Sequence, residues 1–165
     1  MSNIQTVATI VIVALVLLRV IGKQLQGQPV SARSLFLVPA ILLVVGAANA
    51  ANVLSTASAS EVVLLVVNVV LLVPFGLARG ASIGVTVRDG APFQQGTWLT
   101  TTLWVVSIAE RFGASLVAHA MGIPGTLSSA SLMATLGVSL VVQNSVVWWR
   151  AQKLGVPMPA TARRS

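Results

Sequence analysis

Two adjacent charged residues, Glu110 and Arg111, stand inside an otherwise apolar run of the sequence. If that run crosses a membrane, each charge costs at least about 2.5 kcal/mol to insert, so neither side chain is expected to face lipid. Adjacent helical residues point about 100° apart, and each of the two therefore needs its own partner. Ionisable groups inside a membrane are candidates for handling a ligand or a proton.

Polar residues accompany Arg111 at helical spacing. In its own segment and in the following one they recur every four positions, which places them along one face of each helix. We therefore expect an intramembrane polar seam centred on Arg111, whose further members are Glu110, Asn68, Ser107, Ser115, Ser139 and Gln143. The same groups could instead serve only as hydrogen-bonding contacts between helices, at about 0.6 to 2 kcal/mol each.

The elements that must position these residues are transmembrane helices. The chain has 165 residues, of which 56% are hydrophobic and 8% charged, whereas about a quarter of the residues of soluble proteins are charged. A hydrocarbon core of about 30 Å needs about 20 helical residues per crossing. Apolar segments suited to this task cover residues 4–21, 35–54, 62–78, 97–120 and 127–149. The predicted fold is an all-α integral membrane protein, a five-helix transmembrane bundle that forms a single domain.

The distribution of Lys and Arg predicts the orientation of this bundle. All of them except Arg111 flank the first and third connections or follow the last span, while the second and fourth connections contain none. Cytoplasmic loops are enriched in basic residues. We therefore predict a multi-pass cell-membrane protein with the N-terminus outside and residues 150–165 as a basic cytoplasmic tail. The net charge of +7 then reflects topology and attraction to anionic lipid, and no nucleic-acid partner is expected.

The third connection contains a turn signal. Residues 83–87 alternate apolar with small or polar side chains, and Asp89-Gly90 follows them. Asp-Gly between two short extended runs is typical of a tight β-hairpin. We predict a short cytoplasmic hairpin-like loop between the third and fourth helices, with Arg79, Arg88 and Asp89 at its base and tip. Such a loop could gate a cavity or dock a partner, or it could be only a connector.

Several site classes are excluded by composition. The sequence has no Cys and one His, His119, so we expect no metal site, and no cofactor is expected either. Three acidic residues in the whole chain leave no paired-carboxylate site. Acid catalysis would depend on Glu110 alone, which is the candidate general acid for an apolar substrate. His119 lies near the end of its segment, where it is either a solvated residue at the helix end or a proton relay.

Residues 74–153 resemble a group of small actinobacterial integral membrane proteins related to the CcdC-like family. The matching motifs are Gly76-Leu77-Ala78-Arg79-Gly80, Arg88-Asp89-Gly90, Gly96-Thr97, Trp104, Arg111 with Gly113, and Val147-Trp148-Trp149-Arg150-Ala151, together with Arg33 and Leu37-Val38-Pro39 in the first half. The resemblance implies a polytopic helical membrane protein with a short Asp-Gly loop, and it supplies no activity or ligand. Glu110 departs from the apolar residue expected before Arg111, which favours Arg111 as the site residue.

Three functions are consistent with these features. The leading hypothesis is a non-enzymatic membrane protein that transports or accommodates a small or lipid-like molecule, or acts as an accessory subunit, around Arg111. The first alternative is a membrane-embedded enzyme that uses Glu110 as general acid on an isoprenoid or lipid. The second is a structural subunit of a larger membrane complex or homo-oligomer, since small residues at Ala47, Ala51, Ala109 and Gly113 favour close helix packing.

Overall fold

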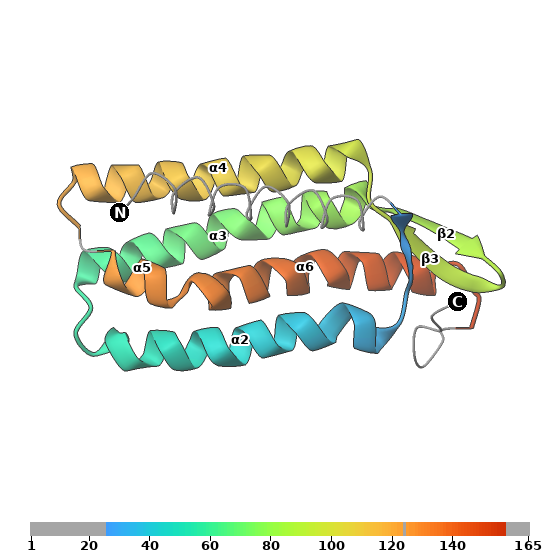
Figure 1. Ribbon diagram of the computed structural model, residues 1–165, viewed down its shortest axis with the longest axis horizontal. Coiled ribbons are helices and arrows are strands. Elements are labelled where there is room, and N and C mark those ends of the chain that lie inside the picture. The colour runs from blue at the N-terminus through green and yellow to red at the C-terminus, as the bar shows by residue number, and fades with distance from the viewer. Residues whose placement is uncertain (1–25, 124, 158–165) are drawn as a thin grey trace, which may run out of the picture.

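The computed structural model describes residues 26–123 and 125–157 of the chain. The predicted first span, residues 4–21, lies outside these residues, as does the last part of the predicted basic tail. Within the described residues the structure is mainly helical, and one small β-sheet lies at one end of the helices (Figure 1).

The four long helices of the described residues lie in one row in the order α2, α6, α3 and α4 (Figure 1). Their bounds are Ala32–Leu54 for α2, Ala59–Ser82 for α3, Trp98–Ala120 for α4 and Leu132–Gln152 for α6. Helices α2, α3 and α4 each begin at a capping box, in which the side chains of Ser31, Ser58 and Thr97 accept the first free backbone N–H groups. These boxes explain why the helices start where the loops end.

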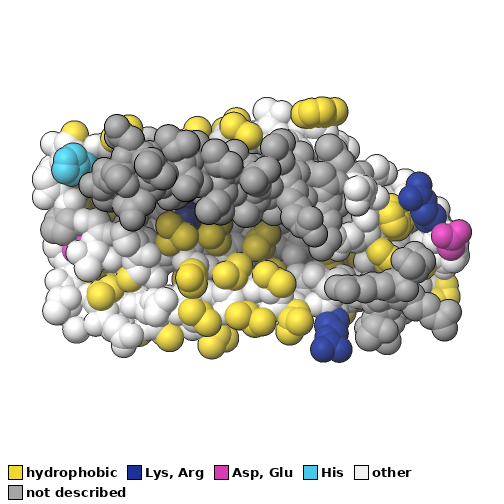
Figure 2. Space-filling model, in the orientation of Figure 1, with side chains coloured by type: hydrophobic (Ala, Val, Ile, Leu, Met, Phe, Trp, Pro, Cys, Tyr) yellow, Lys and Arg dark blue, Asp and Glu magenta, His cyan; other side chains and the backbone are white. Residues whose placement is uncertain are grey.

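Helices α2, α3 and α6 are long and apolar enough to cross a membrane. Helix α4 has the same length as α2, 23 residues, but it is less apolar because it carries Glu110, Arg111 and several hydroxyl side chains. Large apolar side chains on the outward faces remain exposed, as at Val44 and Leu116. Figure 2 shows hydrophobic side chains along the length of the helices, an arrangement suited to contact with lipid.

The predicted span 127–149 is not one continuous helix. A short helix, α5 (Thr126–Ala130), comes first, and α6 starts after a break at Ser131. The hydroxyl of Ser131 donates a hydrogen bond to the carbonyl oxygen of Ser128 at 3.2 Å. Serine side chains that bond their own backbone compete with regular helical hydrogen bonding, which accounts for the break. Apolar composition alone gave no sign of it.

The predicted hairpin between the third and fourth helices is confirmed. Strand β2 (Gly84–Arg88) pairs antiparallel with β3 (Ala91–Gln95). The turn residues Asp89 and Gly90 have φ values of 51° and 72°, and two successive positive φ angles are typical of a type I′ turn. The short strand β1 (Gln28–Pro29) adds to the other edge of β3 and gives the order β1-β3-β2. This third strand was not predicted.

Glycines allow α6 to lie very close to its neighbours. Gly46 of α2 lies against the backbone of Ala134, and a Cβ on Gly80 of α3 would lie 2.6 Å from the carbonyl oxygen of Gln143. Gly76 and Gly80 are one helical turn apart and form a small-xxx-small contact with α6. For Gly113, which the sequence suggested as a packing residue, no atom of the described residues would lie within 4 Å of such a Cβ.

A proline in α2 is compensated by a side chain of α6. Pro39 lacks an N–H group, so the carbonyl oxygen of Leu35 cannot receive its usual helical hydrogen bond. The Asn144 side chain donates a hydrogen bond to this oxygen, with a distance of 2.6 Å between Nδ2 and the oxygen. In a membrane no water is present to replace such a bond. Asn144 therefore replaces the hydrogen bond that the carbonyl oxygen of Leu35 loses because of Pro39.

Candidate functional site

A cavity of about 410 Å³, here called the outer cavity, lies beside several of the predicted site residues. It lies between α3, α4 and the segment formed by α5 and the start of α6, at the end of the bundle away from the sheet. Apolar side chains such as Leu65, Ile108 and Leu132 form part of its wall. Its polar lining includes Asn68, Glu110, Arg111, Ser115, His119 and Thr135.

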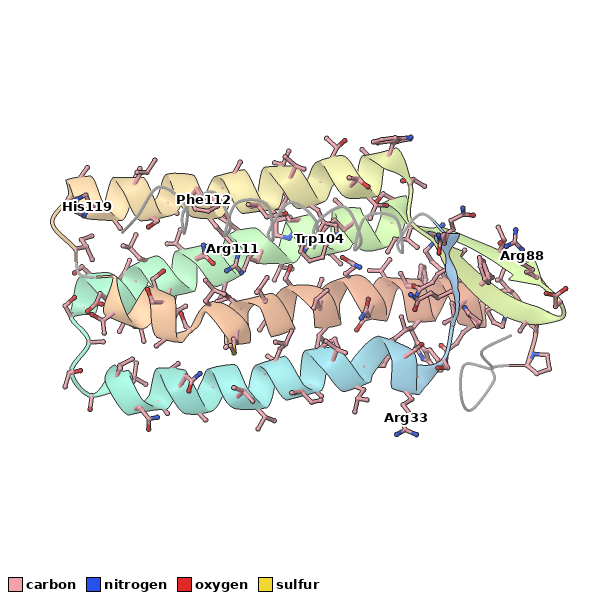
Figure 3. The ribbon with its side chains drawn as sticks, in the orientation of Figure 1. Arg33, Arg88, Trp104, Arg111, Phe112 and His119 are labelled. Carbon is pink, nitrogen blue, oxygen red and sulfur yellow. The ribbon has the colours of Figure 1, made fainter. Side chains whose placement is uncertain are left out.

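Arg111 reaches from α4 across the outer cavity to α6. Its Nη2 donates a hydrogen bond to the hydroxyl of Thr135 at 2.9 Å, and that hydroxyl donates to the carbonyl oxygen of Leu132 at 3.0 Å. Figure 3 shows Arg111 between α4 and α6. A guanidinium group has five N–H donors, and among the described residues only Thr135 accepts from this one. The remaining donors have no acceptor within the part of the chain that the structure describes.

Glu110 lines the same cavity from the adjacent position of α4. Its Oε2 is buried and has no hydrogen-bond partner in the part of the chain that the structure describes. Because neighbouring helical residues point about 100° apart, Glu110 and Arg111 border the cavity from different sides. The outer cavity thus contains one carboxylate and one guanidinium group, each of which has bonding capacity left over.

Glu61 lines the outer cavity at the beginning of α3. Its Oε2 accepts hydrogen bonds from the backbone N–H and the hydroxyl of Ser58, at 3.0 and 3.2 Å. Its Oε1 accepts the backbone N–H of Leu127 at 3.2 Å and so ties α3 to α5. Glu61 is therefore occupied in holding the helix ends together. From the sequence, Glu61 was only one of the three acidic residues, and its contacts with the helix ends could not be predicted.

Arg79 does not lie in the loop where the sequence placed it. Helix α3 continues to Ser82, so Arg79 is in its last turns, and only 1% of the residue is exposed. Its Nη2 donates to the hydroxyl of Ser139, and its Cζ lies 4.1 Å from the ring centroid of Trp104. At this end of α3, Arg150 Nη1 donates to the carbonyl oxygens of Gly80, Ala81 and Ile83.

The predicted polar seam is therefore divided into two parts. Asn68, Glu110, Arg111 and Ser115 meet at the outer cavity. Ser139 and, one turn further along α6, Gln143 belong to the level of Arg79, and we call Arg79, Trp104 and Ser139 the Arg79 cluster. Ser107 joins neither part, because its hydroxyl donates to the carbonyl oxygen of Leu103 at 2.8 Å. Thr135 falls on the same four-residue spacing as Ser139 and Gln143, whereas the contact of Trp104 with Arg79 was not apparent from the sequence.

The hairpin residues lie far from the outer cavity. Arg88 and His119 are at opposite ends of the molecule in Figure 3. The Cζ of Arg88 lies 4.6 Å from the ring centroid of Phe93, and Asp89 occupies the exposed turn. These contacts fix the shape of the hairpin. They contribute no group to the cavity.

The described residues contain no group of three or more His, Asp or Glu side chains that could hold a metal ion. Comparison of the sequence with protein-family models and with curated proteins, and of the structure with solved structures, gives no match. The outer cavity must therefore be interpreted from its own residues.

Proposed function

We propose that this chain is a multi-pass membrane protein that accommodates a small or lipid-like molecule in the outer cavity beside Arg111. The observation that carries the proposal is the cavity itself, about 410 Å³ in volume and lined by apolar side chains with a few polar groups among them. Ligand sites are typically concave, apolar and about 300 to 1,000 Å³ in size, with few polar groups that orient the ligand. Transport of that molecule, or service as an accessory subunit, would use the same cavity.

The proposed membrane arrangement retains the five spans and a cytoplasmic C-terminus. Three apolar helices support membrane insertion. Arg33, Arg88 and Lys153 lie at the sheet end of the described helices, which supports a cytoplasmic position for the sheet by the positive-inside rule. The outer cavity then opens toward the outer leaflet. The resemblance to the CcdC-like membrane proteins is kept as part of this proposal.

The surroundings of Arg111 favour a site over a purely structural role. Arg79 and Arg111 each make one side-chain hydrogen bond to a described residue, and Arg79 Nε has no partner there, so the number of hydrogen bonds does not separate them. Their surroundings do: Arg111 lines the outer cavity, whereas Arg79 is 1% exposed and packs on Trp104. A cavity beside a guanidinium group leaves room for a ligand, and a side chain packed on all sides better fits a structural role.

Two tryptophan substitutions on neighbouring residues of α4 test the proposal. Ser115 lines the outer cavity, so Ser115→Trp should fill it, whereas Leu116 is 70% exposed on the outward face. Native mass spectrometry of protein purified in neutral detergent would measure bound small molecules. Adducts of the wild type should be retained in Leu116→Trp and lost in Ser115→Trp. Equal retention in both variants would refute the use of this cavity.

A membrane-embedded enzyme is a second candidate because of one observation, the unpartnered Oε2 of Glu110 at the cavity wall. In this candidate function Glu110 protonates an isoprenoid or lipid held beside it. The near-isosteric variant Glu110→Gln tests it. If Glu110→Gln no longer forms product from a lipid extract but still retains the adducts seen by native mass spectrometry, the result would favour the enzyme. Unchanged lipid composition with wild type and variant would refute it.

A further inference from the structure

Opposite charges border the outer cavity without pairing with one another. Arg111 donates to Thr135, and Oε2 of Glu110 has no partner among the described residues. The third charged group at the cavity, Glu61, already accepts hydrogen bonds from Ser58 and Leu127. The bonding capacity left for a ligand is therefore that of the Arg111 guanidinium group and the Glu110 carboxylate group.

We infer that the ligand of the outer cavity carries both an ammonium group and an anionic oxygen group, an inference that rests on the proposed function. An oxyanion, such as a phosphate or a carboxylate, matches the forked N–H donors of Arg111. A primary ammonium group supplies N–H donors to the carboxylate of Glu110, which lines the cavity. A single zwitterionic ligand can satisfy both, whereas an anion alone would leave the carboxylate oxygen unpartnered at a cost.

The shape of the outer cavity provides a route for such a ligand. It extends along α4 from Arg111 through Ser115 to His119, a distance of about 12 Å at 1.5 Å per residue. Ser128 and Ser129 line the same space. A charged group entering from the end of the bundle therefore meets polar side chains until it reaches Glu110 and Arg111. The apolar wall at Leu65 and Ile108 could receive an acyl chain.

This chemistry has two sources, the head group of an aminophospholipid and a small free zwitterion. Lysophosphatidylethanolamine serves as probe, and lysophosphatidylglycerol with the same chain as its comparison, because it keeps the phosphate and lacks the ammonium group. Isothermal titration calorimetry in neutral detergent would measure both affinities. The wild type should bind the first at least about tenfold more tightly, equivalent to about 1.4 kcal/mol. Equal affinities would overturn the inference.

Variants assign the two charges of the probe to residues. Glu110→Gln should abolish the preference for lysophosphatidylethanolamine, and Arg111→Gln should weaken both lysolipids by about tenfold or more. Arg88→Gln, in the hairpin at the other end of the molecule, is the matched control and should change neither affinity. A preference that persists in Glu110→Gln would overturn the inference. Since that change is nearly isosteric, it decides the question even if Arg111→Gln fails to fold.

Two further ligands separate the sources and the hypotheses. Phosphoethanolamine has the head group without an acyl chain. If it binds as tightly as lysophosphatidylethanolamine, the ligand is a small zwitterion; if it binds much more weakly, the ligand is a lipid. Both outcomes support the inference. A neutral monoacylglycerol has the chain without charges. If it binds as well as lysophosphatidylethanolamine and Ser115→Trp blocks both, the zwitterion inference fails and the proposed function stands. If Ser115→Trp blocks neither, both fail.

Discussion

The hydrogen bond between Asn144 and the carbonyl oxygen of Leu35 allows a direct test of how α2 is held against α6. Asn144→Leu removes a bond of 2.6 Å to an oxygen that Pro39 deprives of its helical donor. Leaving a buried acceptor unsatisfied costs about 1 to 3 kcal/mol, and single side-chain hydrogen bonds measured in membranes reach about 1.7 kcal/mol. We expect Asn144→Leu to lower the free energy of unfolding by about 1 to 2 kcal/mol.

The double-mutant cycle with Pro39→Ala isolates this effect. An alanine at position 39 would supply the N–H group that bonds the carbonyl oxygen of Leu35, so Asn144→Leu should then cost about 1 kcal/mol less. Unfolding in mixed micelles with increasing sodium dodecyl sulfate would measure all variants. Asn52→Leu, at an exposed position of α2, controls for the loss of an amide. An equal cost of Asn144→Leu in both backgrounds would refute the explanation.

Three further predictions concern packing, the end of α3 and topology. Gly80→Ala should destabilise the bundle by about 1 to 2 kcal/mol, because the added Cβ would lie 2.6 Å from the carbonyl oxygen of Gln143. The control, Gly113→Ala, should be neutral or stabilise by up to about 1 kcal/mol. Equal shifts of the melting temperature of the two variants in detergent would contradict this prediction. Arg150→Met should lower the free energy of unfolding by about 2 to 3 kcal/mol, because it loses the hydrogen bonds to the carbonyl oxygens of Gly80, Ala81 and Ile83. Arg150→Lys should lower it less. An unchanged free energy of unfolding in Arg150→Met would show that the end of α3 does not need these hydrogen bonds. A cysteine at Ala59 should react with an impermeant maleimide on intact cells and one at Thr86 only after permeabilisation; the reverse pattern would overturn the proposed orientation.

The helices and the hairpin could be predicted because their signals are local. Apolar segments indicated where the described helices lie, and Asp89-Gly90 indicated the turn. The break at Ser131 could not be predicted, since it depends on which hydrogen bond a serine side chain makes. Strand β1 was missed because its two residues, Gln28 and Pro29, are too few to give a pattern.

The candidate site was harder to predict because it depends on which helices are neighbours. The four-residue spacing placed Ser107 on the ridge of Arg111, yet its hydroxyl bonds within its own helix. Spacing also could not show that Ser139 contacts Arg79 while Thr135 contacts Arg111, although the two residues are one turn apart on α6. A signal for the helix contacts was present in the spacing of Gly76 and Gly80, which is the small-xxx-small pattern of membrane helices.

The most direct test of the central claim is an experimental density map of the protein purified from membranes and held in lipid nanodiscs. The account predicts density that belongs to no residue in the space between α3, α4 and α6, in contact with Arg111 and Glu110. Its phosphate or carboxylate should face the guanidinium group and its ammonium group the carboxylate. A map in which protein side chains fill this space, with Arg111 and Glu110 bonded only to other residues, would contradict the account.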